Sequence, residues 1–400
     1  MGRSWQPKNG MPRVDLTHAR LASSETARRI NRDIILQLIR ARQPVSRADL
    51  ARLSGLQRST VSQIIEQLIT EHWVRDGAIA HLPRGRHPTM LTLNEELVVL
   101  AADIHPGQAT VAIVDLDGRF LSRSTLPIGS DPGKSVASII EIMKRMRVSH
   151  SSKSLEGIGI SLPGRVDPAT QRLIFAPNLD WPNYDIKRVI ERAMGLPVAV
   201  ENAATSCLMS ELWLGRLDGI RNAVLITVSE GIGAGILSNG QLVTGQHGMA
   251  GEFGHIQLDP AGTRCGCKLN GCWETFASCR AAVRYFSESI PRPKRVTFHE
   301  LLQLADEGNP NAIQALEKQA MYIGRGLRMV TAALAPEVIL VDGDVTSAWD
   351  RFAPAIEREL KALTLAGKPP RLERTHEGDV ARLRGAAALL LQTHGMHASV

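Results

Sequence analysis

The sequence predicts an α/β protein in which a small, mainly helical N-terminal unit precedes two larger α/β lobes. Three observations support this prediction. Basic residues gather in the first quarter of the chain, apolar residues recur at helical spacing between residues 31 and 68, and apolar strand-like runs alternate with helical stretches from Val98 onward. A chain of 400 residues is long enough for two or three domains.

The charge of the chain is unevenly distributed. Residues 1–92 hold fifteen Lys and Arg against seven Asp and Glu, a net charge of +8, whereas the remaining 308 residues have a net charge of −1. This asymmetry is typical of a polyanion-binding unit joined to a neutral one. A solvated basic face without a partner would show the same charge. The choice between these two interpretations therefore depends on the sequence motifs.

Membrane and secreted classes do not fit the sequence. No run of 18 apolar residues is present, and the polar, basic N-terminus lacks the apolar core of a secretory signal, so the expected location is the cytoplasm. An odd number of cysteines, five, argues against a disulfide framework in such a compartment. Residues 1–25 are polar and irregular, which predicts a flexible arm.

Three helical stretches are expected within residues 26–92. The first begins near Asn31, ends at Pro44 and presents one apolar face, formed by Ile34, Ile35, Leu38 and Ile39. Ser46 can cap the second, over residues 46–53, and Asp49 favours its N-terminus. After a turn at Ser54-Gly55, a third stretch over residues 56–68 turns five apolar residues inward: Leu56, Val61, Ile64, Ile65 and Leu68.

Two short helices joined by a glycine turn form the helix-turn-helix motif, whose second helix enters the DNA major groove with its N-terminal residues first. The side chains expected to point away from the core can all hydrogen bond to bases or phosphates, and none is acidic: Arg47, Arg58, Ser59, Thr60, Ser62 and Gln63. A small helical bundle for protein contacts is the alternative, but its surface would usually mix both charges. We therefore predict DNA binding.

Residues 73–92 are predicted to form a β-wing. Residues 73–75 and 78–80 are strand-like on either side of Asp76-Gly77, a hairpin turn signal. Arg84 and Arg86 flank a glycine, which suits a phosphate or minor-groove contact. Residues 26–92 are thus expected to be a winged helix-turn-helix domain.

The remaining 308 residues predict two lobes separated by a ligand cleft. Strands are expected over residues 98–103, 109–115, 157–161, 198–200, 223–228 and 338–341. Helices are expected over 136–147, 186–194 and 205–214 and through most of 274–334. Lobe 1 is placed at about 93–205 together with a C-terminal helix over 378–395, and lobe 2 at about 206–377.

A metal site is indicated by one histidine and three clustered cysteines. His255 is followed after nine residues by Cys265, Cys267 and Cys272, a donor set typical of closed, structural Zn²⁺ sites. Gly271 would let the chain turn back to present the third thiolate. Because imidazole has two ring nitrogens, His255 can bind zinc through one and a ligand through the other.

Several short motifs in the lobes are distinctive when taken together: Leu162-Pro-Gly-Arg-Val-Asp167, Ala176-Pro-Asn-Leu-Asp-Trp181, Val200-Glu-Asn-Ala-Ala204, Gly231-Ile-Gly-Ala-Gly235, Gly251-Glu-Phe-Gly-His255 and the cysteine loop ending in Glu274. In these motifs the chain resembles the ROK family, which groups repressors, open reading frames and sugar kinases. The resemblance spans about residues 30–395. It implies a two-lobed actin-like/hexokinase (ribonuclease H-like) fold, a sugar site in the cleft, zinc, and a homodimer or dimer of dimers.

The resemblance also implies five sugar-binding residues: Asn178, Asn202, Glu252, His255 and Glu274. Their chemistry is suitable, since carboxylates can grip two vicinal hydroxyls while amides and imidazole supply the complementary donors and acceptors. For Asn178, a role in a local turn is an open alternative.

The same resemblance argues against catalysis. A sugar kinase needs a carboxylate base, and the family's kinases have an aspartate where this chain has Ala203. Their nucleotide-binding glycines are replaced by His105 and Pro106, and Glu230 would place a negative charge beside the ATP phosphates. Two more carboxylates, Asp342 and Asp344, stand in the turn that corresponds to the kinases' adenosine-binding glycines. Lys268 departs from a glycine that is usual in the cysteine loop.

The sequence therefore predicts a repressor that is not an enzyme. It would bind double-stranded, palindromic operator DNA at the nucleoid, and a sugar effector would modulate that binding. Two alternatives remain: a bifunctional sugar kinase with a DNA-binding head, and a DNA-binding scaffold whose lobes bind no ligand.

Overall fold

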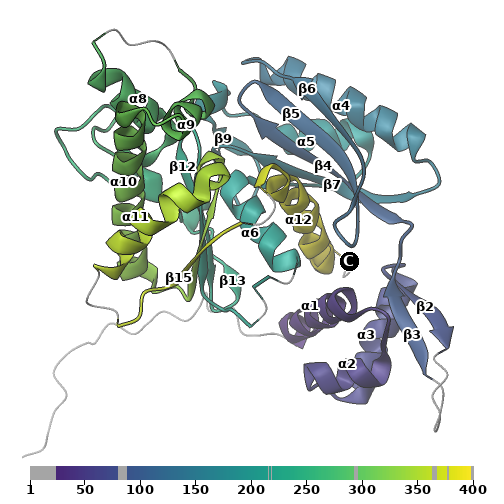
Figure 1. The fold of residues 1–400 in the computed structure, drawn as a ribbon. Coiled ribbons are helices and arrows are strands. Elements are labelled where there is room, and N and C mark those ends of the chain that lie inside the picture. The colour runs from purple at the N-terminus through teal and green to yellow at the C-terminus, as the bar shows by residue number, and fades with distance from the viewer. Residues whose placement is uncertain are drawn as a thin grey trace, which may run out of the picture.

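The computed structural model describes residues 24–79, 88–214, 216–217, 219–291, 296–362, 367–375 and 378–397. It shows a helical head with a small sheet, followed by two lobes that are each built around a five-stranded sheet (Figure 1). The α/β class, the head and the two lobes are thus as the sequence predicts.

The head contains three helices and a three-stranded sheet in the order β1-β3-β2. Its elements are α1 (Ser24–Arg42), β1 (Val45–Ser46), α2 (Arg47–Ser54), α3 (Arg58–Thr70), β2 (Val74–Ile79) and β3 (Thr89–Leu93). The Ser46 hydroxyl caps α2 by accepting from the Asp49 amide at 3.2 Å, as expected. Gly55 ends α2 with φ 72°, a left-handed conformation that suits glycine and forms the helix-turn-helix turn.

Helix α1 differs from its prediction at both its start and its apolar face. It begins at Ser24, so residues 24 and 25 of the predicted arm are helical, while residues 1–23 lie outside the described residues. Ile35 and Ile39 are fully buried, but Ile34 is 38% exposed because it lies at the edge of the face that they define. Leu56 precedes α3 and is only partly buried.

The predicted hairpin turn at Asp76-Gly77 is wrong. Strand β2 runs through both residues and pairs antiparallel with β3, with a register shift between Asp76 and Ile79. A glycine inside a strand often marks such a bulge, and here a Cβ on Gly77 would lie 3.2 Å from the carbonyl oxygen of Met90. The connection between the two strands falls in residues 80–87, outside the described residues, and so do Arg84 and Arg86.

Lobe 1 is a mixed sheet in the order β10-β7-β4-β5-β6. Its main elements are β4 (Leu97–His105), β5 (Gln108–Asp115), β6 (Phe120–Pro127), α4 (Pro132–Ser149), β7 (Ser154–Leu162), α5 (Ile186–Met194) and β10 (Val198–Asn202). A small excursion holds β8 (Arg165–Val166), β9 (Leu173–Phe175) and the 3₁₀ turn η1 (Pro177–Leu179). Strand β4 pairs with β5 in a hairpin and with β7 in parallel, which places the carboxyl ends of β4, β7 and β10 at one edge.

Lobe 2 has the sheet order β13-β12-β11-β14-β15. Its strands are β11 (Ala223–Val228), β12 (Ile232–Ser238), β13 (Gln241–Leu242), β14 (Val338–Asp342) and β15 (Arg371–Arg374). Its helices are α7 (Glu274–Ala277), α8 (Cys279–Ser289), α9 (Phe298–Asp306), α10 (Pro310–Leu334) and α11 (Trp349–Lys361), with 3₁₀ turns η2 (Gln246–Gly248), η3 (Glu252–His255) and η4 (Asp344–Ala348). Helices α7 to α11 pack over one apolar cluster that also takes side chains from β11, β12 and β14.

Two helices lie between the lobes: α6 (Ala203–Trp213) and α12 (Ala381–His397), which follows the short turn η5 (Gly378–Val380). Their backbones touch, because a Cβ on Gly385 would lie only 1.6 Å from the carbonyl oxygen of Ser206. Helix α12 also packs on lobe 1, where a Cβ on Gly159 of β7 would overlap the carbonyl of Ala386. Glycine is therefore required at both contacts. Among the described residues, no helix combines the length and apolarity needed to cross a bilayer.

Candidate functional site

A large cleft of about 1670 Å³ is lined by residues of both lobes. All five sequence-predicted sugar ligands line it, from four different parts of the chain: Asn178, Asn202, Glu252, His255 and Glu274. Ala203 lies on the same wall beside Asn202. The fold therefore brings Ala203 and the predicted polyol-binding side chains to one cavity.

Local structure explains where these side chains stand. Asn178 lies in η1, and Asn202 ends β10 as the N-cap of α6, with its side-chain oxygen accepting from the Thr205 amide at 2.8 Å. Glu252 and His255 begin and end η3, and Glu274 begins α7. Asn202 thus has a structural role in addition to its predicted contact with a ligand.

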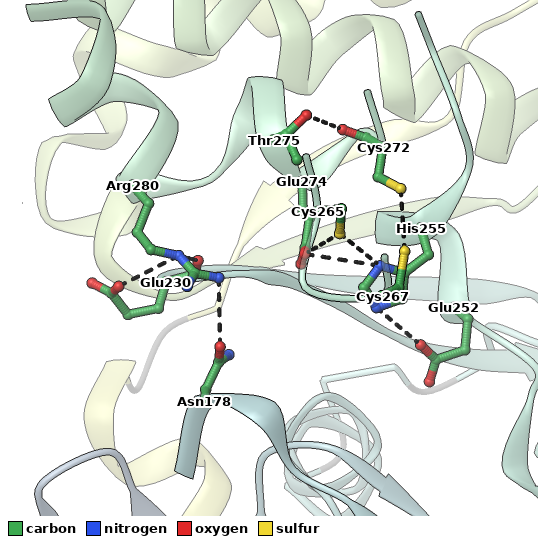
Figure 2. Close-up of polar contacts among 10 residues, drawn as sticks. All are labelled: Asn178, Glu230, Glu252, His255, Cys265, Cys267, Cys272, Glu274, Thr275 and Arg280. Carbon is green, nitrogen blue, oxygen red and sulfur yellow. Dashed lines mark hydrogen bonds and ion pairs between the residues drawn. The ribbon is translucent and has the colours of Figure 1, made fainter. Parts of the chain in front are cut away.

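His255 stands between two carboxylates and the cysteine loop, as Figure 2 shows. Its Nε2 lies 3.6 Å from the Glu252 carboxylate, and its Nδ1 lies 3.5 Å from Cys265 Sγ and 3.8 Å from Glu274 Oε1. The two ring nitrogens therefore face different groups. Nδ1 is directed to the thiols, and Nε2 is directed to a carboxylate of the cleft.

The donor set fits a zinc ion. The ligand atoms of His255, Cys265, Cys267 and Cys272 all lie within 4.8 Å of one another. The Cys267 and Cys272 sulfurs are 3.5 Å apart, as are Cys265 Sγ and His255 Nδ1. Bond lengths of about 2.0–2.3 Å in a tetrahedron require donor separations of roughly 3.3–3.8 Å. These four side chains could thus surround one ion with little rearrangement.

The backbone of the cysteine loop depends on two left-handed residues. Gly271 has φ 64°, and a Cβ there would lie 1.6 Å from the carbonyl oxygen of Asp259, so only glycine lets the chain return to place Cys272. Lys268 has φ 75°, which is costly for a residue with a Cβ. The loop keeps the left-handed turn although this chain has a lysine at that position.

The carboxyls of the cleft differ in their surroundings. Burial raises the pKa of Glu252, an effect that His255 and Arg165 oppose. Glu201, the partly buried neighbour of Asn202, has a pKa raised to about 7 by desolvation, although it accepts hydrogen bonds from the backbone and side-chain amides of Asn202. Glu201 does not line the cleft, so we assign it no ligand contact.

The other half of the cleft holds several charged side chains, and some of them pair with one another. Asp103, at the end of β4, contacts His105 at 2.9 Å and Arg382 of α12 at 3.3 Å. Burial alone would raise the pKa of Asp103, but Arg382 and His105 together hold it below its usual value. Asp342 is buried and accepts from Thr375 at 2.5 Å, and Asp344 lies nearby on the wall.

Arg280 is a cleft residue that the sequence does not reveal. Its Nε donates to the Glu230 carbonyl oxygen at 2.6 Å, and its Nη2 lies 3.4 Å from Asn178 Oδ1 across the cleft (Figure 2). Glu230 is thus partnered from within lobe 2. The contact with Asn178 joins positions 102 residues apart, and no local pattern could have predicted it.

The predicted DNA-binding side chains of α3 lie on the face of that helix that is turned away from the core. Arg58, Ser59 and Gln63 are exposed at the start of α3, and Thr60 and Ser62 are partly exposed. Arg47 is instead paired with Asp76 of β2 at 3.1 Å, which fixes the wing strand to α2. Burial of Val61, Ile64, Ile65 and Leu68 turns the opposite face of α3 to the core.

Comparisons with known proteins agree with both parts of the chain. The family model described as "ROK family" matches residues 99–393, and the model described as "IclR helix-turn-helix domain" matches residues 33–77. The xylose repressor of Bacillus spizizenii is 28% identical over 86% of this chain and 89% of its own length. The glucokinase of Streptomyces coelicolor is 31% identical over 68% of this chain and 89% of its own length.

A solved structure shares the entire arrangement. It is described as a ROK family transcriptional regulator, a homologue of the E. coli MLC protein, and it superposes with a TM-score of 0.79 at 27% identity. The match covers 92% of this chain and 97% of that one, so it includes head and lobes. This chain belongs to the ROK family and has a helix-turn-helix head.

Proposed function

We propose that this protein is a transcriptional repressor whose operator binding is modulated by a sugar that it does not phosphorylate. The observation that carries the proposal is the composition of one cleft. It gathers carboxylates, amides and an imidazole suited to a polyol, while Ala203 stands where a kinase would need a base. A methyl group cannot accept the proton of an attacking hydroxyl.

The head supports the DNA-binding part of this proposal. The exposed or partly exposed face at the start of α3 offers Arg58 and four further hydrogen-bonding side chains, and the head carries most of the excess positive charge. We propose that a homodimer, or a dimer of dimers, places two heads on the half-sites of a palindromic operator. Repressors with similar sequences, such as the xylose repressor above, favour this over the other uses of a helix-turn-helix.

The half of the cleft that contains Asp103 and Glu230, where a kinase would bind its nucleotide, supports the absence of catalysis. Asp103 is already paired with Arg382 and His105, and Glu230 with Arg280. Glu230 and Asp344 would also place negative charge beside a polyphosphate. A nucleotide would have to break these pairs and overcome that repulsion.

We further propose that His255, Cys265, Cys267 and Cys272 hold a zinc ion. The ion would be structural, since four protein donors leave no open coordination position. It would fix the loop that leads from His255 to Glu274 and so preset the two side chains for the sugar. The Nε2 of His255 would remain available to a hydroxyl.

The size of the cleft supports a closing motion. Small ligands usually occupy pockets of about 300–1,000 Å³, whereas this cleft measures about 1670 Å³. A monosaccharide could contact both walls only after the lobes approach each other. If the closed state binds the operator more weakly, the sugar is an inducer, with a coupling of typically ~1–3 kcal/mol.

A sugar-library thermal shift assay followed by operator binding tests the proposal. At least one sugar should raise the melting temperature of the wild-type chain and change its operator affinity by about five- to 150-fold. Glu252→Ala should lose the response to that sugar while it retains operator binding in its absence. If no sugar stabilises the chain, the lobes are a scaffold without a ligand and the sensor proposal fails.

A bifunctional kinase is the second candidate, because the glucokinase above shares 31% identity with this chain. A coupled assay of ATP consumption over hexoses and pentoses separates the two. We expect no sugar-dependent turnover from the wild-type chain. Sugar-dependent consumption of ATP that disappears in Asn202→Ala would establish the kinase instead.

A further inference from the structure

Helix α6 extends from the candidate sugar site to the DNA-binding head. Its N-cap is Asn202, which lines the cleft, and its last residue is Trp213. The Arg40 guanidinium of α1 lies over the Trp213 ring, 5.4 Å from its centroid. Figure 1 shows α1 beneath the end of α6, so one helix contacts both functional regions.

The surroundings of α6 leave it little freedom to bend. Residues 204–211 are all buried. A Cβ on Gly235 of β12 would lie 2.8 Å from the carbonyl oxygen of Ala204, and on the other side Gly385 brings α12 against Ser206. Because α6 follows β10 of lobe 1 and packs on β12 of lobe 2, closure of the lobes must shift it against at least one of them.

The head is packed on the same elements and not merely tethered to them. Ile35 and Ile39 of α1 belong to one apolar cluster with Met209 of α6 and a row of α12 side chains, and Trp213 packs against that cluster. A displacement of α6 would therefore disturb the packing of α1 in the head.

A second contact ties the end of α1 to lobe 1. The Gln43 amide donates to Asp117 in the β5–β6 turn at 2.6 Å, while its carbonyl accepts from the Leu93 amide at 2.8 Å. Arg384 of α12 supports the same turn by donating to the Gly118 carbonyl at 2.6 Å. Gln43 thus connects α1, the strand that leads out of the head, and lobe 1.

We propose that α6 is the lever that carries the state of the cleft to the DNA-binding head. A ligand would act on α6 at its Asn202 cap, and α6 would act on α1 through the contact between Trp213 and Arg40. A ligand hydroxyl that competes for the Asn202 side chain, or closes the lobes around it, shifts α6 and thereby α1. This inference rests on the proposed function for its role, but the mechanical link itself can be tested without any sugar.

Hydrogen exchange on the full-length chain, without ligand, tests the link directly. Asn202→Ala removes the cap of α6 and should accelerate exchange about fivefold in α1 as well as in α6. Asn202→Ser retains a capping side chain and should restore slow exchange in both helices. In a Trp213→Leu background, Asn202→Ala should no longer affect α1. Unchanged α1 exchange in Asn202→Ala, with α6 alone accelerated, would overturn the proposal.

Operator binding provides the second readout and separates this inference from the proposed function. Trp213→Leu should bind the effector sugar with wild-type affinity but change its operator affinity less than twofold when the sugar is added. Arg42→Gln, at an exposed neighbouring position of α1, should respond as the wild type does. A wild-type chain that ignores every sugar contradicts the proposed function, whereas a full response in Trp213→Leu contradicts the lever.

Discussion

At the scale of single residues, His255 is the point where the candidate metal and sugar sites meet. Its Nδ1 faces the thiols and its Nε2 faces Glu252, so the orientation of the ring is set from both sides. Metal binding at the loop would therefore determine how the imidazole is presented to a ligand. The same ring cannot turn to improve one contact without losing the other.

Cys265→Ser tests the metal site. We expect it to lose stoichiometric zinc and several degrees of melting temperature, because a closed site missing one thiolate binds zinc far more weakly. Cys279→Ala, a cysteine outside the cluster that is also buried, should retain the metal. Metal analysis of the purified variants provides the measurement, and equal zinc in both would refute the assignment of Cys265.

Lys268→Gly tests the strain in the cysteine loop. Because Lys268 has φ 75°, glycine should stabilise the fold by about 1 kcal/mol, less a small entropic loss. Lys268→Ala removes the charge but keeps the Cβ, and should bring no gain. Denaturant unfolding of both variants with saturating zinc measures the difference, and equal midpoints would show that the left-handed backbone is not strained.

Residue types predicted the candidate site well where they were unusual, and poorly where partners are distant in sequence. The histidine and cysteines could be found because soft ligands clustered within eight positions are rare. The ion pair between Asp103 and Arg382 could not be predicted, since 278 intervening residues separate them and no sequence pattern links the two. The fold alone brings them together.

At the scale of elements, hydrophobic period and caps predicted most helices and strands. The boundaries of the helix over 186–194 and of the strand over 223–228 agree with the structure to the residue. In the wing, only the predicted turn at Asp76-Gly77 was wrong, because Asp-Gly is a turn signal when the sequence alone is considered. Strand β2 continues through both residues, paired antiparallel with β3, and the register shifts after Asp76.

Helix α3 makes a specific prediction about DNA recognition. Arg58→Ala should weaken operator binding by about five- to 150-fold, without loss of stability, because its exposed side chain can reach bases or phosphates. Glu66→Ala, exposed near the other end of the helix, should leave affinity unchanged or slightly higher. Fluorescence anisotropy at several salt concentrations measures both, and equal affinity for Arg58→Ala and the wild type would place the DNA elsewhere.

The close packing of α12 on α6 can be tested by substitution at Gly385. Gly385→Ala should destabilise the protein by about 3 kcal/mol or more, because the new methyl group overlaps the Ser206 carbonyl and must force the two helices apart. Gly129→Ala places its methyl group in open space and should cost little. Thermal unfolding compares them, and a wild-type melting temperature for Gly385→Ala would show that the helices are less tightly packed.

At the scale of the whole molecule, the head and the lobes share one apolar core. The apolar cluster that holds the head together continues through α6 and α12 into lobe 1, while the cleft opens at the other end of α6. The sequence indicated two lobes and a head from composition and period. The sequence does not indicate this shared core, because the core brings together α1, α6 and α12, each more than 150 residues from the next.

We propose that sugar binding in the cleft alters operator affinity without chemical change to the sugar. The most direct test titrates the wild-type chain, bound to labelled operator and supplied with Mg-ATP, with the sugar that stabilises it most, and then analyses the sugar. We expect operator affinity to change at least about fivefold and the sugar to be recovered unmodified. Recovery of a sugar phosphate, or operator affinity that no sugar changes, would contradict it.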